Sequence, residues 1–217
     1  FGWNPILENE NIIGLNKGGK NITLEPGNQI ELSGEKLNHL HEACAESQDY
    51  LFELRQVTQK LDINIVSAGF DPISKLDEIP NNPKQRYKLM TKDMPLGGEL
   101  SLDMMYRTCG TQLNLDYKSE DDFIKKFKIV NSIVPISIAL FANSAIVEKK
   151  KSNYLSYRSK VWQSTSRGGL PKIFFEELDF EKYAEFVINF PILFIQHEGT
   201  YVSGRKYVFK DFMEGKI

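Results

Sequence analysis

The sequence predicts an α+β fold with an antiparallel sheet. Short segments that read as strands are mixed with longer segments whose apolar residues recur every three or four positions. The regular β-α-β alternation that is typical of a parallel sheet is absent. With 217 residues, 41% of them hydrophobic, the chain can bury a core as one large domain or as two small ones.

A β-meander is predicted across residues 11–33, where the turn sequences KGGK and PGN separate short β-type runs. If the PGN loop holds three residues, Glu25 pairs with Gln29 and Thr23 pairs with Glu31. Alternate residues of a strand face the same way, so these four side chains should share one face of the sheet.

Helices are predicted from periodicity and capping residues. Residues 35–61 form a long amphipathic pattern behind Ser33, a plausible N-cap. Ser119 and Asp122 resemble a capping box that opens another helix, and residues 180–188 predict a third. Arg86 lies at the start of a helix that follows a proline-rich loop.

Strands are predicted at three further places. Residues 63–70 form a short apolar run and read as a buried strand, and residues 191–196 read as a strand before a turn. Residues 108–117 alternate cleanly, which puts Gln112 and Asn114 on a polar, amide-rich face.

Composition excludes several classes of partner and site. The net charge is -2 with both signs mixed along the chain, so no nucleic-acid partner is expected. No apolar run approaches the ~20 residues that span a bilayer, and residues 133–142 read as a buried helix, so no membrane partner is expected. Cys44 and Cys109 are too few for a disulfide framework or a zinc site, and buried thiols are expected.

The ends of the chain suggest an internal fragment. It opens with Phe1 rather than Met and closes just after the helix-like DFMEG segment. We therefore expect residues 1–217 to be a partial domain whose N- and C-terminal parts are missing.

Oxygen donors on the predicted strand faces suggest a magnesium site. Glu25 and Glu31 lie on one face, and Gln112 lies on the polar face of another predicted strand. Carboxylate and amide oxygens suit Mg²⁺ rather than zinc or copper. The alternative is a solvated hairpin whose charges simply face water.

Two arginines are candidates for gripping a charged ligand. Arg86 follows the proline-rich loop. Arg158 lies in YLSYRSKVW, where Tyr154, Tyr157 and Trp162 could wall a pocket. The planar guanidinium matches a carboxylate or a phosphate. The alternative for each arginine is a surface salt bridge.

Several separated motifs together resemble one family. IIGLNKGGKNITLEPGNQIELSG, PKQRYKLM, LSLDMMYRTCGTQLNLDY, LFANS, YLSYRSKVW and FKDFMEGKI resemble, in order and spacing, the glutamate-cysteine ligases of the plant and proteobacterial type. The resemblance implies a glutamine-synthetase-like fold, in which an antiparallel sheet curls into a funnel with helices packed outside. It implies L-glutamate, L-cysteine and ATP as substrates, Mg²⁺ as cofactor, and γ-glutamylcysteine as product through a γ-glutamyl phosphate, the first step of glutathione synthesis.

The resemblance also implies roles for particular residues. Arg86 and Arg158 match arginines that the family uses on glutamate, and Glu25 and Glu31 would hold Mg²⁺ and the ATP phosphates. Gln112 would contribute a ligand to the metal site.

Asn114 would join the substrate wall, and Tyr87, Tyr157 and Trp162 would shape the amino acid pockets. Asn28 stands where a second turn glycine is expected, which asparagine tolerates because it accepts a positive φ.

Two alternative functions remain open, and the source of the enzyme is inferred only indirectly. A related ligase could join glutamate to another amine, and a non-enzymatic amino acid or nucleotide binding protein would need no paired metal carboxylates. The lysine- and asparagine-rich composition and the missing transit peptide favour a cytoplasmic bacterial enzyme.

Overall fold

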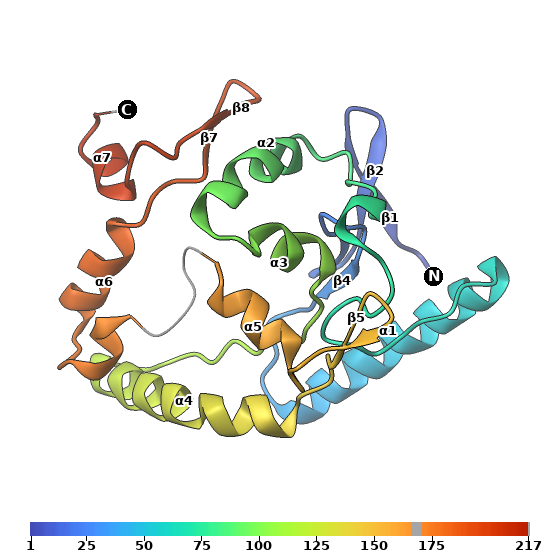
Figure 1. Ribbon diagram of the computed structural model, residues 1–217, viewed down its shortest axis with the longest axis horizontal. Coiled ribbons are helices and arrows are strands. Elements are labelled where there is room, and N and C mark those ends of the chain that lie inside the picture. Colours follow the sequence, from blue (N-terminus) through green and yellow to red (C-terminus); the bar gives the residue numbers. More distant parts are fainter. Residues whose placement is uncertain (166–170, 217) are drawn as a thin grey trace.

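A computed structural model describes residues 1–165 and 171–216 and shows a mixed helix and strand architecture. Figure 1 shows α2, α3 and α5 near the middle of the molecule, with α1 and α4 along one edge and α6 and α7 along another. The described strands form antiparallel pairs in the orders β1-β2-β3-β4, β5-β6 and β7-β8. The α+β class is therefore confirmed at this coarse level.

The strands are β1 (Asn4–Glu8), β2 (Asn11–Lys17), β3 (Lys20–Leu24), β4 (Ile30–Ser33), β5 (Ile146–Val147), β6 (Lys150–Lys151), β7 (Phe194–His197) and β8 (Thr200–Ser203). The α-helices are α1 (Leu40–Leu61), α2 (Gln85–Asp93), α3 (Ser101–Arg107), α4 (Glu120–Leu140), α5 (Tyr157–Gln163), α6 (Phe180–Ile188) and α7 (Phe209–Met213). Short 3₁₀ helices cover Leu76–Glu78, Met94–Gly97 and Lys172–Phe175.

The meander has the predicted register. Thr23 is the partner of Glu31, and Glu25 N donates to the carbonyl of Gln29 at 2.8 Å. Asn28 has a φ of 63°, as expected for a turn position that favours glycine or asparagine. Glu31 lies opposite Thr23, and Glu25 follows Thr23 by two residues. Because alternate residues face the same way, Glu25 and Glu31 lie on one face of the sheet.

The first helix starts later than predicted. It begins at Leu40 with His39 in the N-cap position, so the prediction of a start at residue 35 behind Ser33 is wrong. Two main-chain donors are satisfied by glutamates from α1 itself: Glu35 N donates to Glu46 at 3.0 Å, and Asn38 N donates to Glu42 at 2.7 Å. These hydrogen bonds to side chains satisfy two main-chain donors of the segment without helical turns.

Two predicted strands do not form. Phe70 of the first segment, residues 63–70, pairs in an isolated bridge with Thr108 of the second, residues 108–117. Within the described part of the chain, the rest of both segments belongs to no strand. Ile63, Ile65 and Val66 are exposed rather than buried. Period-two alternation and apolar runs favour strands, but a strand also needs a neighbour with free hydrogen-bonding groups.

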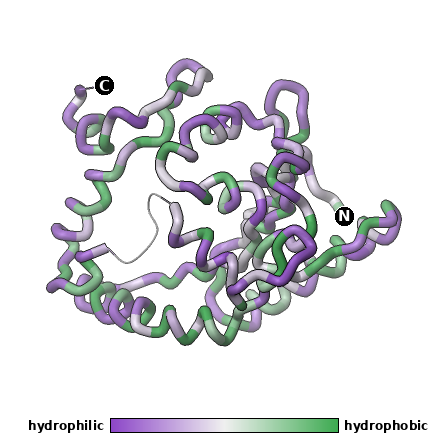
Figure 2. Tube along the Cα trace, viewed as in Figure 1, coloured by the Kyte–Doolittle hydropathy of each residue, from purple (hydrophilic) through white to green (hydrophobic). Residues whose placement is uncertain are grey.

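Helices α4 and α6 follow the predicted signals. Ser119 caps α4 by accepting from Asp122 N at 3.2 Å, and α6 has the predicted bounds. Helix α4 continues through Pro135. Residues 133–142 are not buried, so the prediction of a buried helix there is wrong. Figure 2 shows apolar stretches along α4. Among the described helices, none combines the length and apolar character needed to cross a bilayer.

A small core lies under α2 and α3. Tyr87, Met105 and Tyr106 are buried together, and the partly buried apolar residues Leu76, Ile79, Met90, Met94 and Leu102 pack around them. Thr91 Oγ1 and the Tyr106 hydroxyl are 2.5 Å apart, which ties the two helices together. Both cysteines are exposed, so the prediction of buried thiols at Cys44 and Cys109 is wrong.

Candidate functional site

Glu25 is held at the end of the meander by two side chains. Its Oε1 accepts from Thr23 Oγ1 at 3.2 Å, and its Oε2 accepts from the Tyr87 hydroxyl at 3.1 Å. Burial raises the pKa of the Tyr87 hydroxyl, so the phenol remains protonated and able to donate. Tyr87 is only 2% exposed, so the structure puts it beneath the carboxylate rather than on the wall of an open pocket.

Lys84 brings a buried ammonium to the same place. Its Nζ donates to the Leu24 carbonyl at 2.7 Å and to the Tyr87 hydroxyl at 3.4 Å, and the residue is 5% exposed. Burial lowers the pKa of Lys84, while the charges of Glu25, Glu8 and Glu31 act to raise it. The cation therefore faces a group of carboxylates at this end of the sheet.

Arg86 lies on the first turn of α2 and contacts the same phenol. Its Nη2 donates to the Tyr87 hydroxyl at 3.3 Å, and its guanidinium carbon lies 5.1 Å from the Tyr87 ring centroid. The hydrogen bond to Tyr87 raises the pKa of Arg86. Glu8 supports this turn, because its Oε2 accepts from Gln85 N at 2.9 Å and complements the positive end of the helix.

The oxygen donors fit magnesium in kind, but not all predicted ligands meet. Glu25 and Glu31 share a face, and Glu31 Oε1 accepts from Ser33 Oγ at 3.5 Å. Within residues 1–165 and 171–216, no cluster of three or more His, Cys, Asp or Glu residues could hold a metal. Gln112 and Asn114 are exposed in the unpaired segment and bond to each other at 2.9 Å. Glu25 and Glu31 therefore share a sheet face, and their role as metal ligands stays a prediction.

Arg158 lies on the first turn of α5, which is fixed by Ser144. Arg158 N donates to Ser144 Oγ at 3.2 Å, and Tyr157 N donates to the Ser144 carbonyl at 3.1 Å. The Arg158 Nε donates to the Cys109 carbonyl at 2.9 Å, and the guanidinium carbon lies 5.4 Å from the Trp162 ring centroid. Burial lowers the pKa of Arg158, yet arginine stays charged in proteins.

Tyr157 is part of the support of this site. Its ring packs edge-on against buried Phe70, with centroids 5.0 Å apart. Phe70 in turn lies under Arg107, whose guanidinium carbon is 4.5 Å from the Phe70 centroid. Arg107 is 3% exposed and pairs with Asp103 at 2.9 Å and Glu148 at 3.3 Å.

The two groups of site residues are joined through the end of α3. Gln29 Nε2 donates to the carbonyls of Tyr106 at 2.9 Å and Thr108 at 3.3 Å. The next carbonyl along the chain, that of Cys109, accepts from Arg158. A Cβ at Gly27 would collide with the Tyr106 carbonyl, so a residue without a side chain is needed for this approach. The Glu25 turn and Arg158 therefore contact one short stretch of main chain.

Sequence reasoning missed Lys84 and Arg107. A buried lysine has no signature in a single sequence, because lysine is usually exposed. Arg107 follows Asp103 by four positions, a spacing that indicates a helical ion pair, but this spacing does not indicate burial.

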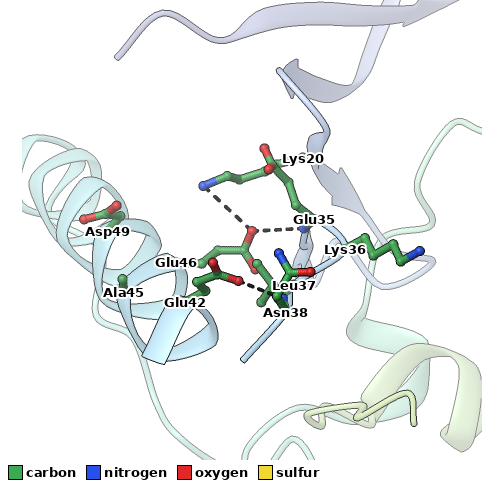
Figure 3. Close-up of a pocket in the computed structure, with 9 residues that line it drawn as sticks. All are labelled: Lys20, Glu35, Lys36, Leu37, Asn38, Glu42, Ala45, Glu46 and Asp49. Atoms are coloured by element: carbon green, nitrogen blue, oxygen red, sulfur yellow. Dashed lines mark hydrogen bonds and ion pairs between the residues drawn. The ribbon is translucent and has the colours of Figure 1, made fainter. Parts of the chain in front are cut away.

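A hollow of about 370 Å³ lies between the meander and α1, apart from these groups. Figure 3 shows its acidic lining, including Glu35, Glu42 and Glu46. Glu46 pairs with Lys20 at 3.7 Å and accepts from Glu35 N, and Glu42 accepts from Asn38 N. These internal contacts explain the charges, and none of the predicted site residues lines the hollow.

Comparisons with known proteins give one consistent result. The model of glutamate-cysteine ligase family 2 matches residues 6–213. The chain is 42% identical to the chloroplastic glutamate–cysteine ligase of Nicotiana tabacum over 220 residues, which cover 100% of this chain and 42% of the relative. Similar matches are glutamate–cysteine ligase A of Oryza sativa subsp. japonica, 42% identical over 45% of its length, and the Arabidopsis thaliana enzyme, 40% identical over 42% of its length.

The chain spans less than half the length of these relatives. They are chloroplastic enzymes of plants, so the expectation of a cytoplasmic bacterial enzyme is wrong. Lysine and asparagine content follows no compartment-specific chemistry, and this explains why composition misled that prediction. With a family match over residues 6–213 and relatives at 40% to 42% identity, the chain belongs to glutamate-cysteine ligase family 2.

Proposed function

We propose that this chain works in an ATP-dependent ligase that joins the γ-carboxylate of L-glutamate to the amine of L-cysteine. The observation that supports this proposal most directly is the family match over residues 6–213. Two further features support the same ligase reaction: the carboxylates Glu25 and Glu31 on one sheet face, and the arginines Arg86 and Arg158 at the starts of α2 and α5. Residues 1–217 would be part of the catalytic domain, and its sheet would belong to a glutamine-synthetase-like funnel.

The proposed reaction has two transfers. An oxygen of the glutamate γ-carboxylate attacks the γ-phosphorus of ATP and ADP leaves, which gives γ-glutamyl phosphate. The cysteine amine then attacks the acyl carbon, loses a proton, and displaces inorganic phosphate. The product is γ-glutamylcysteine, and its formation is the first step of glutathione synthesis.

The charged residues would divide this work. Arg158 would hold a substrate carboxylate through Nη1 and Nη2, because its Nε is already bonded to the Cys109 carbonyl. Arg86 would add a second positive charge at the end of the meander. Glu25 and Glu31 would hold Mg²⁺, which when bound neutralises charge on the phosphate oxygens. Trp162 would limit water around Arg158.

The test is an assay of the full-length protein with L-glutamate, ATP, Mg²⁺ and L-cysteine. We expect γ-glutamylcysteine and ADP in equal amounts, and loss of both when Mg²⁺ is chelated. Parallel reactions with alanine or 2-aminobutyrate separate cysteine from other acceptors. ADP release with another amine alone would replace cysteine as the acceptor, and no Mg²⁺-dependent ADP release with any amine would exclude a ligase.

A further inference from the structure

The guanidinium of Arg158 lies directly against main chain that carries no side chain. A Cβ at Gly110 would be 2.8 Å from Arg158 Nη2, 3.3 Å from Cζ and 3.5 Å from Nε. Real Cβ atoms essentially never approach a heavy atom within 3.0 Å, so a side chain at this position would displace the guanidinium. The same group is bonded through Nε to the Cys109 carbonyl at 2.9 Å.

A second glycine lies against the stem of the same arginine. A Cβ at Gly69 would be 3.3 Å from Arg158 Cδ and 2.7 Å from Asn143 Oδ1. Neither Gly69 nor Gly110 has a φ in the left-handed region that favours glycine, so φ does not explain glycine at either position. At Gly110 the space that Arg158 occupies favours glycine, whereas at Gly69 the nearest obstacle is Asn143 Oδ1 and Arg158 Cδ comes second.

We infer that Gly110 is a positioning residue for Arg158, with Gly69 in a lesser role. The bare main chain lets the guanidinium lie flat beside Cys109, so Nε is fixed and the Nη1 and Nη2 edge is presented to a substrate carboxylate. Within residues 1–165 and 171–216, no protein hydrogen bond uses that edge. This inference rests on the proposed function, in which Arg158 binds glutamate.

An alanine at position 110 should affect the position of Arg158 more than the stability of the fold. The atom that an alanine at position 110 would meet first is the far end of a long, flexible side chain, so the protein can relieve the contact by moving Arg158. Fold stability should change little, whereas the guanidinium should leave its place. A geometric disturbance of a charge-assisted hydrogen bond predicts a glutamate KM raised by about five- to tenfold, with the ATP KM changed less than about twofold.

The experiment compares Gly110→Ala, Arg158→Lys and the double variant in the full-length protein. Gly19→Ala is a matched control, because its Cβ would meet another flexible charged side chain, with Glu35 Cγ at 3.1 Å, on the β2–β3 turn. Glutamate KM, ATP KM, kcat and Tm are measured for each variant. Glutamate binding without turnover is measured by calorimetry. Gly69→Ala provides a second variant should Gly110→Ala fail to fold.

The double variant gives the decisive result. Lysine has no Nη2, so Gly110→Ala should add less than about twofold to the glutamate KM of Arg158→Lys. The positioning role is overturned if Gly110→Ala leaves the glutamate KM unchanged. It is also overturned if Gly110→Ala raises the glutamate KM by the same factor in the wild-type protein and in Arg158→Lys. If Arg158→Lys weakens glutamate while Gly110→Ala does not, only this inference fails. If the wild-type protein neither binds nor uses glutamate, the proposed function fails with it.

Discussion

Arg158 donates from Nε to the main-chain carbonyl of Cys109 at 2.9 Å, which links the first turn of α5 to the segment that follows α3. The same segment accepts hydrogen bonds from Gln29 at the turn of the meander. The orientation of this arginine therefore depends on a stretch of chain that is 49 positions away in sequence. Changes at either end of this link should be measurable in ligand binding.

Arg158→Lys should raise the glutamate KM by about tenfold or more, with a much smaller change in the ATP KM. Lysine keeps the charge but loses both the planar fork and the Nε bond to Cys109. Steady-state kinetics with each substrate varied in turn give both constants. Arg55→Lys, at an exposed position of α1, is the matched control. A shift confined to ATP would remove Arg158 from the glutamate site.

Glu25→Gln and Glu31→Gln should each raise the Mg²⁺ concentration needed for half-maximal turnover and lower kcat. Each change removes a formal charge from a site for a hard cation but keeps the side-chain shape. Metal titrations of activity check this, and circular dichroism verifies the fold. Glu198→Gln, in the exposed β7–β8 turn, should behave like the wild type. Unaltered metal dependence at both sites would contradict the metal role.

Tyr87→Phe should lower the free energy of unfolding by about 1 to 3 kcal/mol. The hydroxyl accepts from Lys84 and Arg86 and donates to Glu25, and phenylalanine leaves buried Lys84 and the partly buried Arg86 and Glu25 each without one hydrogen-bond partner. Denaturant titration provides the measurement. Tyr154→Phe, at an exposed position, should cost little. Equal effects of the two substitutions would mean that the buried network adds no stability.

Arg107→Met should destabilise the fold by roughly 3 kcal/mol, because it leaves the Asp103 carboxylate without its partner in a buried setting. Lys126→Met breaks an ion pair of the same spacing, Lys126 with Asp122 at 2.8 Å, on the surface of α4. That loss should be much smaller than the loss in Arg107→Met, because water screens an exposed ion pair. Chemical denaturation of both variants compares the pairs directly. Similar losses would show that burial does not increase the dependence on Arg107.

Asp71 should make stability depend on pH in the acid range. Burial acts to raise the pKa of Asp71, but hydrogen bonds from Ser74 N at 2.9 Å and Ile73 N at 2.7 Å lower it below its ordinary value of 3.8. A depressed carboxyl pKa stabilises the fold above pH 3.8, and this contribution is lost as the pH falls through the folded-state value.

Asp71→Asn keeps an acceptor but cannot titrate. Its difference from wild type in the free energy of unfolding should be about 1 kcal/mol at pH 7 and should shrink below pH 3.8. Urea denaturation at pH 7, 5 and about 3 measures the difference. A difference that stays constant or grows with acid would contradict the sign of this linkage.

The sequence by itself determined the features that depend on local chemistry. The PGN turn fixes the pairing of Thr23 with Glu31, because loop length sets the register of a hairpin. Ser119 starts α4 because its hydroxyl accepts from a main-chain amide three residues later. The motifs that extend along the chain also predicted the family, since their order and spacing are properties of the sequence alone.

Tertiary structure decided which segments found partners and which charges were buried. Residues 108–117 alternate like a strand, but among the residues that the structure describes no neighbouring strand completes a ladder with them. Lys84 can be buried because its ammonium donates hydrogen bonds to the Tyr87 hydroxyl and to the Leu24 carbonyl, and Leu24 lies 60 positions away in sequence. The setting of Arg158 likewise depends on Gly110, which becomes its neighbour only after folding. Hydrogen bonding and close packing act between segments that are distant along the chain, so periodicity along the chain could not predict these contacts.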